Sequence, residues 1–313
     1  MAQIVIQTES LDPEARVWLE ERGYRVIAAP LGEVSADDRA AAVALVVRTY
    51  TQIDAAALAT MPSVRVVGRA GVALDNIDIP ACRARGVEVV HTPGANSSAV
   101  AEYVFALLFD VTRPRTFVHS GMDLGAWEST RADLLATRQL REMTMGVYGM
   151  GRVGQRVARI AQAIEMPVIY NDIREIPASE RWGAEPVSRD ELFARADVLT
   201  VHVDDRPANR GLVDAAAFGA MRPGVIFVSA ARGLIVDAEA AAGFFRENPS
   251  AIGLFDVHDP EPFGDDYPLL GIDNVHLAPH IAAATTLAKR NMSWVVKDVD
   301  RVLRGESPEH RAP

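Results

Sequence analysis

The chain has 313 residues, of which 49% are hydrophobic and 24% are charged, and its formal net charge is −10 at pH 7. That length can hold two domains, and the composition is that of an ordinary globular protein. The acidic balance, without a basic tail or stripe, argues against nucleic-acid binding. No apolar stretch reaches the roughly 18 residues that a membrane span needs.

The amino-terminal residues pass directly into the apolar run Ile4–Ile6, without the basic region or cleavage site of a signal peptide. The single cysteine, Cys82, excludes an intramolecular disulfide and is best interpreted as a small packing residue. We therefore expect a cytoplasmic protein that binds neither membranes nor nucleic acid.

Apolar runs alternate with helical patterns along almost the whole chain, which predicts α/β domains with doubly wound parallel sheets. In the first hundred residues, Asp12 and Pro13 mark a helix start, and Gly23 and Gly86 mark helix ends. The predicted strands there are Ile4–Ile6, Arg25–Ile27, Val43–Val47, Val64–Val67 and Val87–Val90.

A long helix is predicted at Ser98–Thr112, and after it the chain reaches Gly149-Met150-Gly151-Arg152-Val153-Gly154. This glycine loop lies between the strand Met145–Tyr148 and an amphipathic helix, and the strand that follows ends in Asp172. The layout is typical of a βαβ unit that binds a dinucleotide.

The residue types of the loop fit that chemistry. Gly149 allows a tight turn, Gly151 lets a pyrophosphate approach the backbone, and Gly154 lets helix and strand pack closely. Amides at the helix start bind phosphates. Asp172 accepts hydrogen bonds from a ribose and repels a 2′-phosphate, which favours NAD over NADP, although Arg174 is a counter-signal. A strand, turn and helix without ligand is the alternative.

Further strands are predicted at Val198–Val203, Val225–Ala230, Ala251–Phe255 and Val275–Leu277, and Ser188 to Glu191 form a capping box. Arg232, Asp256, Glu261 and His280 follow three of these strands. In parallel sheets, ligands bind where strands end. An arginine can grip a carboxylate, a histidine can deliver a proton, and an acid beside the histidine can fix its tautomer.

Each of these residues also has a structural interpretation. Arginines after strands are usually solvated, acids are common in proline-rich loops such as that of Glu261, and a lone histidine is more often structural than catalytic. His202, His258 and His276 lie in or near strands as well.

A last helix, Thr285–Leu303, is expected to return to the first domain. We predict a discontinuous substrate domain (1–98 and 285–313), flavodoxin-like, and a Rossmann NAD-binding domain (99–284), with a cleft between them.

Several motifs, in order and over nearly the whole chain, resemble the signatures of the D-isomer-specific 2-hydroxyacid dehydrogenases. The residues of these motifs are most similar to those of the phosphoglycerate dehydrogenase branch, without its carboxy-terminal regulatory extension. The motifs are Gly149–Gly154, Ser229–Asp237, Asp256–Pro262 and Leu277–Ile281, preceded by Val47–Thr49, Gly68–Asp78 and His91–Asn96.

The resemblance implies that Arg232 clamps the substrate carboxylate, that His280 is the acid/base, and that Glu261 is its partner. It also implies that Asp256 contacts the nicotinamide carboxamide. The implied cofactor-binding residues are Gly149, Gly151, Arg152, Val153, Gly154, Asp172, His202, Ala230 and Asp256. The implied substrate-binding residues are Arg48, Arg69, Gly71, Val72, Ala73 and Asn96. No metal ligand is predicted.

The resemblance implies an NAD-dependent enzyme that forms homodimers and acts on a small anionic 2-hydroxy or 2-oxo acid. Arg48 and Arg69 would face a second substrate anion, or they only make salt bridges. The alternatives are a glyoxylate or hydroxypyruvate reductase, an enzyme like formate or phosphite dehydrogenase, and a non-catalytic NAD-sensing interaction protein.

Four departures from the family pattern stand out. Ala73 replaces a glycine, His91 an asparagine, Asp204-Asp205 a Pro-Leu pair, and Ala282-Ala283 a Gly-Gly pair. The alanines add methyl groups and so bear on the size of the substrate and nicotinamide pocket. The two aspartates add negative charge near the cofactor, which disfavours NADP.

Overall fold

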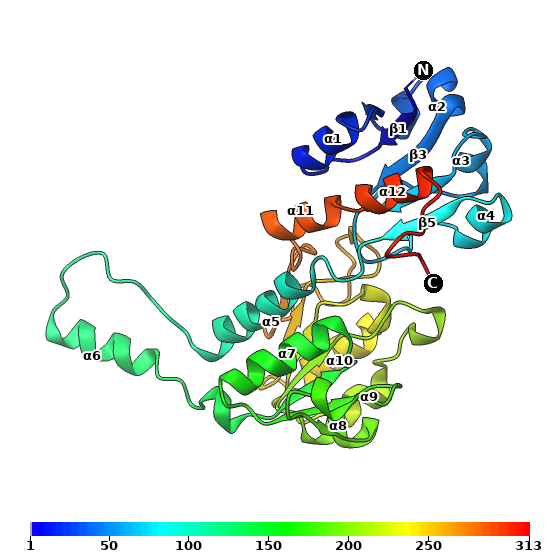
Figure 1. Ribbon diagram of the computed structural model, residues 1–313. Coiled ribbons are helices and arrows are strands. Elements are labelled where there is room, and N and C mark those ends of the chain that lie inside the picture. Colours follow the sequence, from blue (N-terminus) through cyan, green and yellow to red (C-terminus); the bar gives the residue numbers. More distant parts are fainter. Residues whose placement is uncertain (1) are drawn as a thin grey trace. The chain divides into compact units, whose positions relative to one another are not determined.

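The computed structural model describes residues 2–313 and divides them into two compact units. Unit 1 comprises Met1–Asn96 and Ala283–Pro313, and unit 2 comprises Ser97–Ala282. Each unit contains one sheet of parallel strands with helices packed against it, as shown in Figure 1. This confirms the predicted fold class of two parallel-sheet α/β domains.

The sheet of unit 1 has five strands in the order β2-β1-β3-β4-β5, which is the flavodoxin-like order. Its strands are β1 (Ile4–Gln7), β2 (Arg25–Ala28), β3 (Ala42–Val47), β4 (Val66–Arg69) and β5 (Glu88–His91). Its helices are α1 (Pro13–Glu20), α2 (Ala36–Ala41), α3 (Ala55–Ala59), α4 (Ile79–Ala84), α11 (Thr286–Ser293) and α12 (Val296–Leu303).

The sheet of unit 2 has seven strands in the order β12-β11-β10-β9-β6-β7-β8. Its strands are β6 (Met145–Tyr148), β7 (Val168–Asn171), β8 (Glu185–Pro186), β9 (Val198–Val201), β10 (Ile226–Ser229), β11 (Ile252–Phe255) and β12 (Val275–Leu277). Its helices are α5 (Ser97–Thr112), α6 (Leu124–Asp133), α7 (Arg152–Ala163), α8 (Arg189–Arg195), α9 (Ala215–Gly219) and α10 (Ala238–Glu247).

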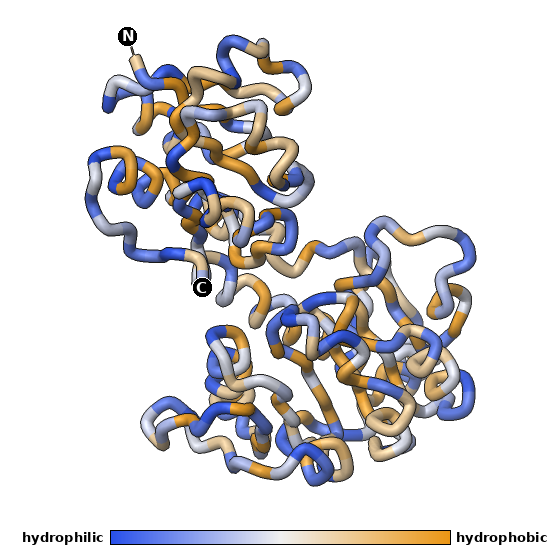
Figure 2. The backbone as a smooth tube through the Cα atoms, turned by 90° about the vertical axis from the view of Figure 1, so that its right-hand side faces the viewer, coloured by the Kyte–Doolittle hydropathy of each residue, from blue (hydrophilic) through white to orange (hydrophobic). Residues whose placement is uncertain are grey.

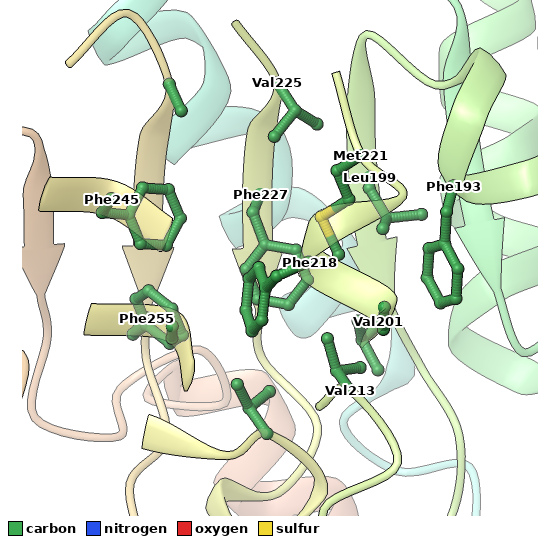
Figure 3. Close-up of a cluster of buried hydrophobic side chains, with 14 of the residues drawn as sticks. Phe193, Leu199, Val201, Val213, Phe218, Met221, Val225, Phe227, Phe245 and Phe255 are labelled. Carbon is green, nitrogen blue, oxygen red and sulfur yellow. The ribbon is translucent and has the colours of Figure 1, made fainter. Parts of the chain in front are cut away.

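Apolar side chains fill the interior of each unit. In Figure 2, hydrophobic stretches of the backbone run through the interior of each unit, and hydrophilic stretches are common in its outer loops. In unit 2, five phenylalanines from strands and helices pack edge-on or tilted against one another or their neighbours, as drawn in Figure 3. Aromatic rings bury large areas and prefer these geometries, so this cluster fixes α8, α9 and α10 on one face of the sheet.

The local helix signals in the sequence are confirmed. Asp12 caps α1 with Pro13 at its first turn, and Ser188 and Glu191 form the reciprocal capping box of α8. Gly23 and Gly86 have φ values of 86° and 69°, the left-handed conformation that ends a helix.

The predicted helix Thr285–Leu303 is wrong in one respect, because the structure contains two helices, α11 and α12, in its place. The amides of Trp294 and Val295 bond to carbonyls three residues back, so the chain tightens there. Trp294 also packs edge-on against Trp18 of α1, with ring centroids 6.2 Å apart. Tertiary packing thus interrupts a pattern that is periodic in the sequence.

The carboxy-terminal residues complete the sheet of unit 1. The amide of Ala312 donates to the carbonyl of Val89, and Arg311 forms an antiparallel bridge with Val90 at the free edge of β5. Asp298 of α12 is buried and accepts the amides of Glu309 and His310, which holds this last segment in place.

The Glu9 carboxylate organises the loop that follows β3. It accepts the backbone amides of Arg48, Thr49, Tyr50 and Thr51 at 2.9–3.3 Å. Burial by itself raises the pKa of Glu9, but these amides outweigh burial and hold the pKa below its usual value. The ionised carboxylate therefore stabilises this loop, which presents Arg48.

We predict that Glu9→Gln lowers the free energy of unfolding by about 1–2 kcal/mol at pH 7, because hydrogen bonds to a half-buried charge are lost. The pKa of Glu9 is lower in the folded chain, so its contribution is complete above the unfolded pKa and is lost as the pH falls through the folded value. Denaturant unfolding from about pH 3 to 8 should show wild type and variant converging in acid.

Glu20→Gln is the matched control, since Glu20 makes only an exposed ion pair with Arg16. A stability difference between wild type and Glu9→Gln that stays constant across the pH range would contradict this role of Glu9.

Candidate active site

The predicted site residues of unit 2 lie at one edge of its sheet. All strand pairs there are parallel, so every segment that follows a strand emerges at the carboxyl edge. The glycine loop follows β6 and Asp172 follows β7. Arg232, Asp256 and His280 follow β10, β11 and β12, which are adjacent in the sheet. The chain reverses its direction of winding between β6 and β9, where open sheets bind ligands.

The glycine loop has the geometry that a dinucleotide needs. Gly149 has a φ of 97°, and a Cβ there would lie 2.7 Å from the backbone of His202. A Cβ at Gly154 would lie 2.1 Å from the carbonyl oxygen of Gly149, whereas a Cβ at Gly151 would meet open space. Protein backbone therefore packs closely against Gly149 and Gly154. The space beside Gly151 is open, and a pyrophosphate would approach the loop there.

The first turn of α7 offers donors at the same point. Gly151 is its N-cap and provides no side-chain acceptor, so the amides of Arg152, Val153 and Gly154 start the helix without a side-chain cap. Such amides and the helix dipole bind phosphate. The residues present therefore fit a dinucleotide cofactor.

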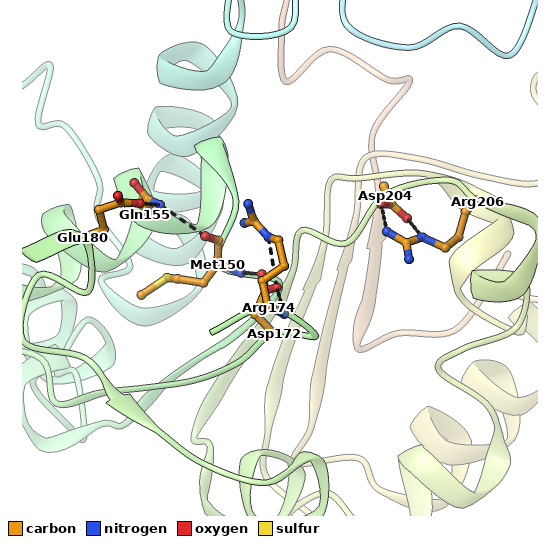
Figure 4. A network of polar contacts seen from close by, with 7 residues as sticks. All are labelled: Met150, Gln155, Asp172, Arg174, Glu180, Asp204 and Arg206. Carbon is orange, nitrogen blue, oxygen red and sulfur yellow. Dashed lines mark hydrogen bonds and ion pairs between the residues drawn. The ribbon is translucent and has the colours of Figure 1, made fainter. Parts of the chain in front are cut away.

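Asp172 lies directly against this loop (Figure 4). Its Oδ2 accepts the amide of Met150 at 2.7 Å, and its Oδ1 accepts the amide of Arg174 at 2.8 Å. Arg174 also approaches Oδ1 through Nε at 3.4 Å. Among the described residues, Oδ2 has only the Met150 amide as a donor and keeps a further lone pair with which it can accept a ribose hydroxyl.

His202 follows β9, the strand next to β6, and Ala230 follows β10, one strand further along the sheet. The His202 amide donates to the Tyr148 carbonyl at 2.7 Å, and the Thr200 hydroxyl lies 2.8 Å from its Nε2. Burial lowers the pKa of His202, so its imidazole is neutral near pH 7. Ala230 is buried directly after β10.

His280 and Glu261 are in direct contact. Nδ1 of His280 lies 2.7 Å from Oε2 of Glu261, and the other oxygen, Oε1, accepts the His258 amide at 2.7 Å. Burial by itself raises the pKa of Glu261, but the hydrogen bonds from His280 and His258 outweigh it, and the pKa is lowered. Glu261 is therefore ionised at neutral pH and accepts a proton that resides on Nδ1, which leaves Nε2 of His280 for other partners.

Asp256 holds the loop that carries His280. Its side chain is fully buried, and its two oxygens accept the amides of Ile281 and Ala282 at 2.8 and 2.9 Å. Burial raises the pKa of Asp256, and the two amides only partly offset this. His280 itself has a φ of 54°, a conformation that costs a non-glycine residue about 1–2 kcal/mol. Backbone strain of this kind clusters at functional sites.

Arg232 makes no contact with this pair among the contacts of the described residues. Its Nη1 donates to the Ala231 carbonyl at 2.6 Å, and its Nε lies 3.7 Å from Oδ2 of Asp205. The structure therefore brings Glu261 and His280 together. It places Arg232 after the end of β10, the strand next to β11, with the carboxylate of Asp205 beside it.

The predicted substrate residues lie at the carboxyl edge of the sheet in unit 1. Arg48 follows β3, Arg69 ends β4, and Asn96 precedes α5. Arg69 is largely buried, and a Cβ at Gly71 would lie 1.5 Å from its Nη1, so this guanidinium rests directly against the glycine. The loop of Gly71, Val72 and Ala73 is fixed by Nδ1 of His91, which donates to the Val72 carbonyl at 2.9 Å.

The sequence did not reveal several residues that shape these loops. Asn76 donates to the carbonyls of Arg48 and Thr51 and complements Glu9 on the other side of their loop. His258, a candidate left open, is buried, and its Nε2 donates to the Ala278 carbonyl at 2.8 Å, so it braces the segment before His280. A weak signal for Glu9 was its position two residues after the end of β1.

Two further classes of site were sought in the part of the chain that the structure describes. Within residues 2–313, no helix is both long and apolar enough to cross a membrane. No group of three or more histidine, cysteine, aspartate or glutamate side chains in that range is arranged to hold a metal ion.

Comparison with known proteins identifies the fold and the family. Residues 105–282 match the family "D-isomer specific 2-hydroxyacid dehydrogenase, NAD binding domain". The crystal structure of the TT0316 protein from Thermus thermophilus superposes with a TM-score of 0.83 at 30% identity, covering 99% of this chain and 100% of that one.

Curated relatives extend the match into unit 1. D-3-phosphoglycerate dehydrogenase of Archaeoglobus fulgidus is 38% identical over 84% of this chain and 50% of its own length. (S)-sulfolactate dehydrogenase of Chromohalobacter salexigens is 35% identical over 83% of this chain and 84% of its own. The match to the phosphoglycerate dehydrogenases thus spans about half of their length. With its NAD-binding domain in unit 2, the chain belongs to the D-isomer specific 2-hydroxyacid dehydrogenase family.

Proposed function

We propose that this protein is an NAD-dependent dehydrogenase that interconverts a small 2-hydroxy acid and its 2-oxo acid. The hydrogen bond between Glu261 and His280, beside the arginine at the next strand end, carries this proposal. Unit 2 is the NAD-binding domain, and unit 1 is proposed to supply substrate contacts. The contact between a titratable histidine and an ionised acid argues against a protein that only senses NAD.

The chain's own residues have distinct roles in this reaction. NAD, when bound, accepts or supplies the hydride. Glu261 keeps the proton of the neutral His280 imidazole on Nδ1, so that Nε2 takes up the hydroxyl proton in oxidation and returns it in reduction. Arg232 binds the substrate carboxylate and polarises the C2 oxygen. Asp256 sets the position of His280 through the amides of Ile281 and Ala282, and the nicotinamide contact first expected of it remains a proposal.

The experiment that tests the activity is a panel of 2-oxo acids assayed by NADH absorbance, with 2-hydroxy acids and NAD in the reverse direction. Background turnover across the panel, in protein shown to bind NADH, would refute the proposed activity.

For His280→Ala we predict a loss of about 10²–10⁴-fold in kcat with NADH affinity retained, because a positioned acid/base contributes that much. His276→Ala is the matched control, since His276 is exposed on β12, the strand that precedes His280. Turnover of the His280 variant within a few-fold of wild type would remove His280 from this role.

The substrate is proposed to carry a second anionic group, such as a phosphate or a sulfonate. Arg48 and Arg69 lie at the same sheet edge as the Gly71–Ala73 loop, in a chain whose net charge of −10 gives no general attraction for anions. Two relatives bear names of substrates with such groups, 3-phosphoglycerate and sulfolactate. Salt bridges alone are the competing explanation for the two arginines.

We predict that 3-phosphohydroxypyruvate or 3-sulfopyruvate exceeds hydroxypyruvate in kcat/KM, and that Arg48→Gln reduces this advantage by about 10–100-fold, the value of a charge-assisted hydrogen bond. Hydroxypyruvate turnover should change little. Arg65→Gln is the control, because Arg65 is exposed at the opposite end of β4. Equal kcat/KM values for all three substrates would contradict a second anion site.

A homodimer through unit 2 is proposed from the segment between α5 and β6. Helix α6 has no buried residue, and Phe117, Leu124 and Leu135 are 76%, 72% and 78% exposed. In Figure 1 this segment stands away from the sheet of its own unit. Exposed apolar groups of this density mark interaction sites, and a second copy of the chain is the proposed partner.

Light scattering should give twice the chain mass of 33.9 kDa, and Leu124→Glu combined with Trp127→Glu should give the monomer. Leu287→Glu in α11 is the control, because Leu287 is 64% exposed but lies in unit 1. A wild-type protein that is monomeric at micromolar concentration would contradict the proposal.

A further inference from the structure

The guanidinium of Arg232 is engaged by groups of the protein itself. Its Nη1 donates to the Ala231 carbonyl at 2.6 Å, and its Nε lies 3.7 Å from Oδ2 of Asp205. The side chains of Arg232 and Asp205 are 29% and 34% exposed, so the pair is within reach of solvent and small molecules. A carboxylate binds a guanidinium bidentately either across both Nη atoms or across Nε and one Nη. Each of these arrangements overlaps one of the existing contacts.

The loop that follows β9 fixes the position of Asp205. Within it, the Asp204 carboxylate accepts Nε of Arg206 at 2.7 Å and Nδ2 of Asn209 at 2.8 Å (Figure 4 shows the pair with Arg206). The end of the loop is held by Arg210, whose Nη1 lies 2.7 Å from Oδ2 of Asp259. These contacts shape the loop in which Asp205 lies beside Arg232.

We propose that Asp205 is an internal competitor for the substrate carboxylate and thereby sets the affinity of the site for anions. The inference rests on the proposed function, in which Arg232 binds that carboxylate. Asp205 lies 3.7 Å from Nε of Arg232 and partly offsets its charge, so a substrate carboxylate that approaches Nε must displace Asp205 and also experiences its repulsion. Interactions of this kind act on the bound substrate and the transition state alike, and they change KM more than kcat.

Competition and a positioning role predict opposite effects on substrate binding when Asp205 is removed. If Asp205 oriented Arg232 for productive binding, its removal would weaken substrate binding. If it competes, its removal strengthens binding, and the gain shrinks in high salt because the pair is partly exposed to solvent.

The test compares Asp205→Asn, which keeps the shape and removes the charge, with Asp190→Asn, which removes the same charge from the exposed start of α8. The first measurement is the rate at which phenylglyoxal modifies Arg232 in the cofactor-free protein, followed by mass spectrometry of the peptide. We expect a rate about 2–5-fold higher in Asp205→Asn and unchanged in Asp190→Asn, in keeping with the strength of exposed ion pairs.

The second measurement is steady-state reduction of hydroxypyruvate at low and high ionic strength. We expect KM to fall about 2–5-fold in Asp205→Asn at low salt, with a smaller change in kcat, and the difference to narrow at about 0.5 M salt. An unchanged or increased KM would overturn the proposal. The labelling needs no turnover: a faster rate in an inactive protein would uphold the contact while the dehydrogenase function fails, and an unchanged rate would overturn the contact itself.

Discussion

The parallel register of the strands is the constraint on which the site in each unit depends. In a parallel sheet, every segment that follows a strand lies at the same edge. Residues far apart in the chain are therefore brought to one edge by the strands and need no direct contact with one another. In unit 2 this edge receives the glycine loop, Asp172, Arg232, Asp256 and His280. In unit 1 it receives the loops of Arg48 and Gly71. What the strands do not specify is the shape of each loop, and hydrogen bonds must supply that.

Carboxylates provide much of this shaping. Glu9 accepts four consecutive amides, Asp256 accepts the two amides after His280, and Asp172 accepts an amide of the glycine loop. A carboxylate is the strongest acceptor among side chains and carries up to about four lone pairs, so one residue can hold an entire turn. Some of the acidic residues of the chain therefore serve to shape its loops. For this reason the net charge of the whole chain is a poor guide to the charge that a ligand meets at the site.

The sequence predicted what local patterns determine. Strands, helix caps and the glycine loop follow from spacing within a few residues, and Asp172 was found because it ends the next strand. Glu9 could not be found in this way, since its partners lie 39 to 42 positions along the chain. The same applies to Asp205 and Arg232, which meet only because β9 and β10 are adjacent. The break between α11 and α12 was missed because it arises from the packing of Trp294 against Trp18.

The discontinuous unit 1 has a consequence for the order in which a ribosome makes this protein. Unit 2 is continuous, so all of its strands are available once residue 282 has emerged. The first five strands emerge earlier, yet α12 and the segment that pairs with β5 through Ala312 are synthesised only after unit 2. The nascent chain therefore carries an unfinished sheet with an open edge throughout the synthesis of a complete second unit. The usual amino-to-carboxyl succession of domain folding is inverted in this chain.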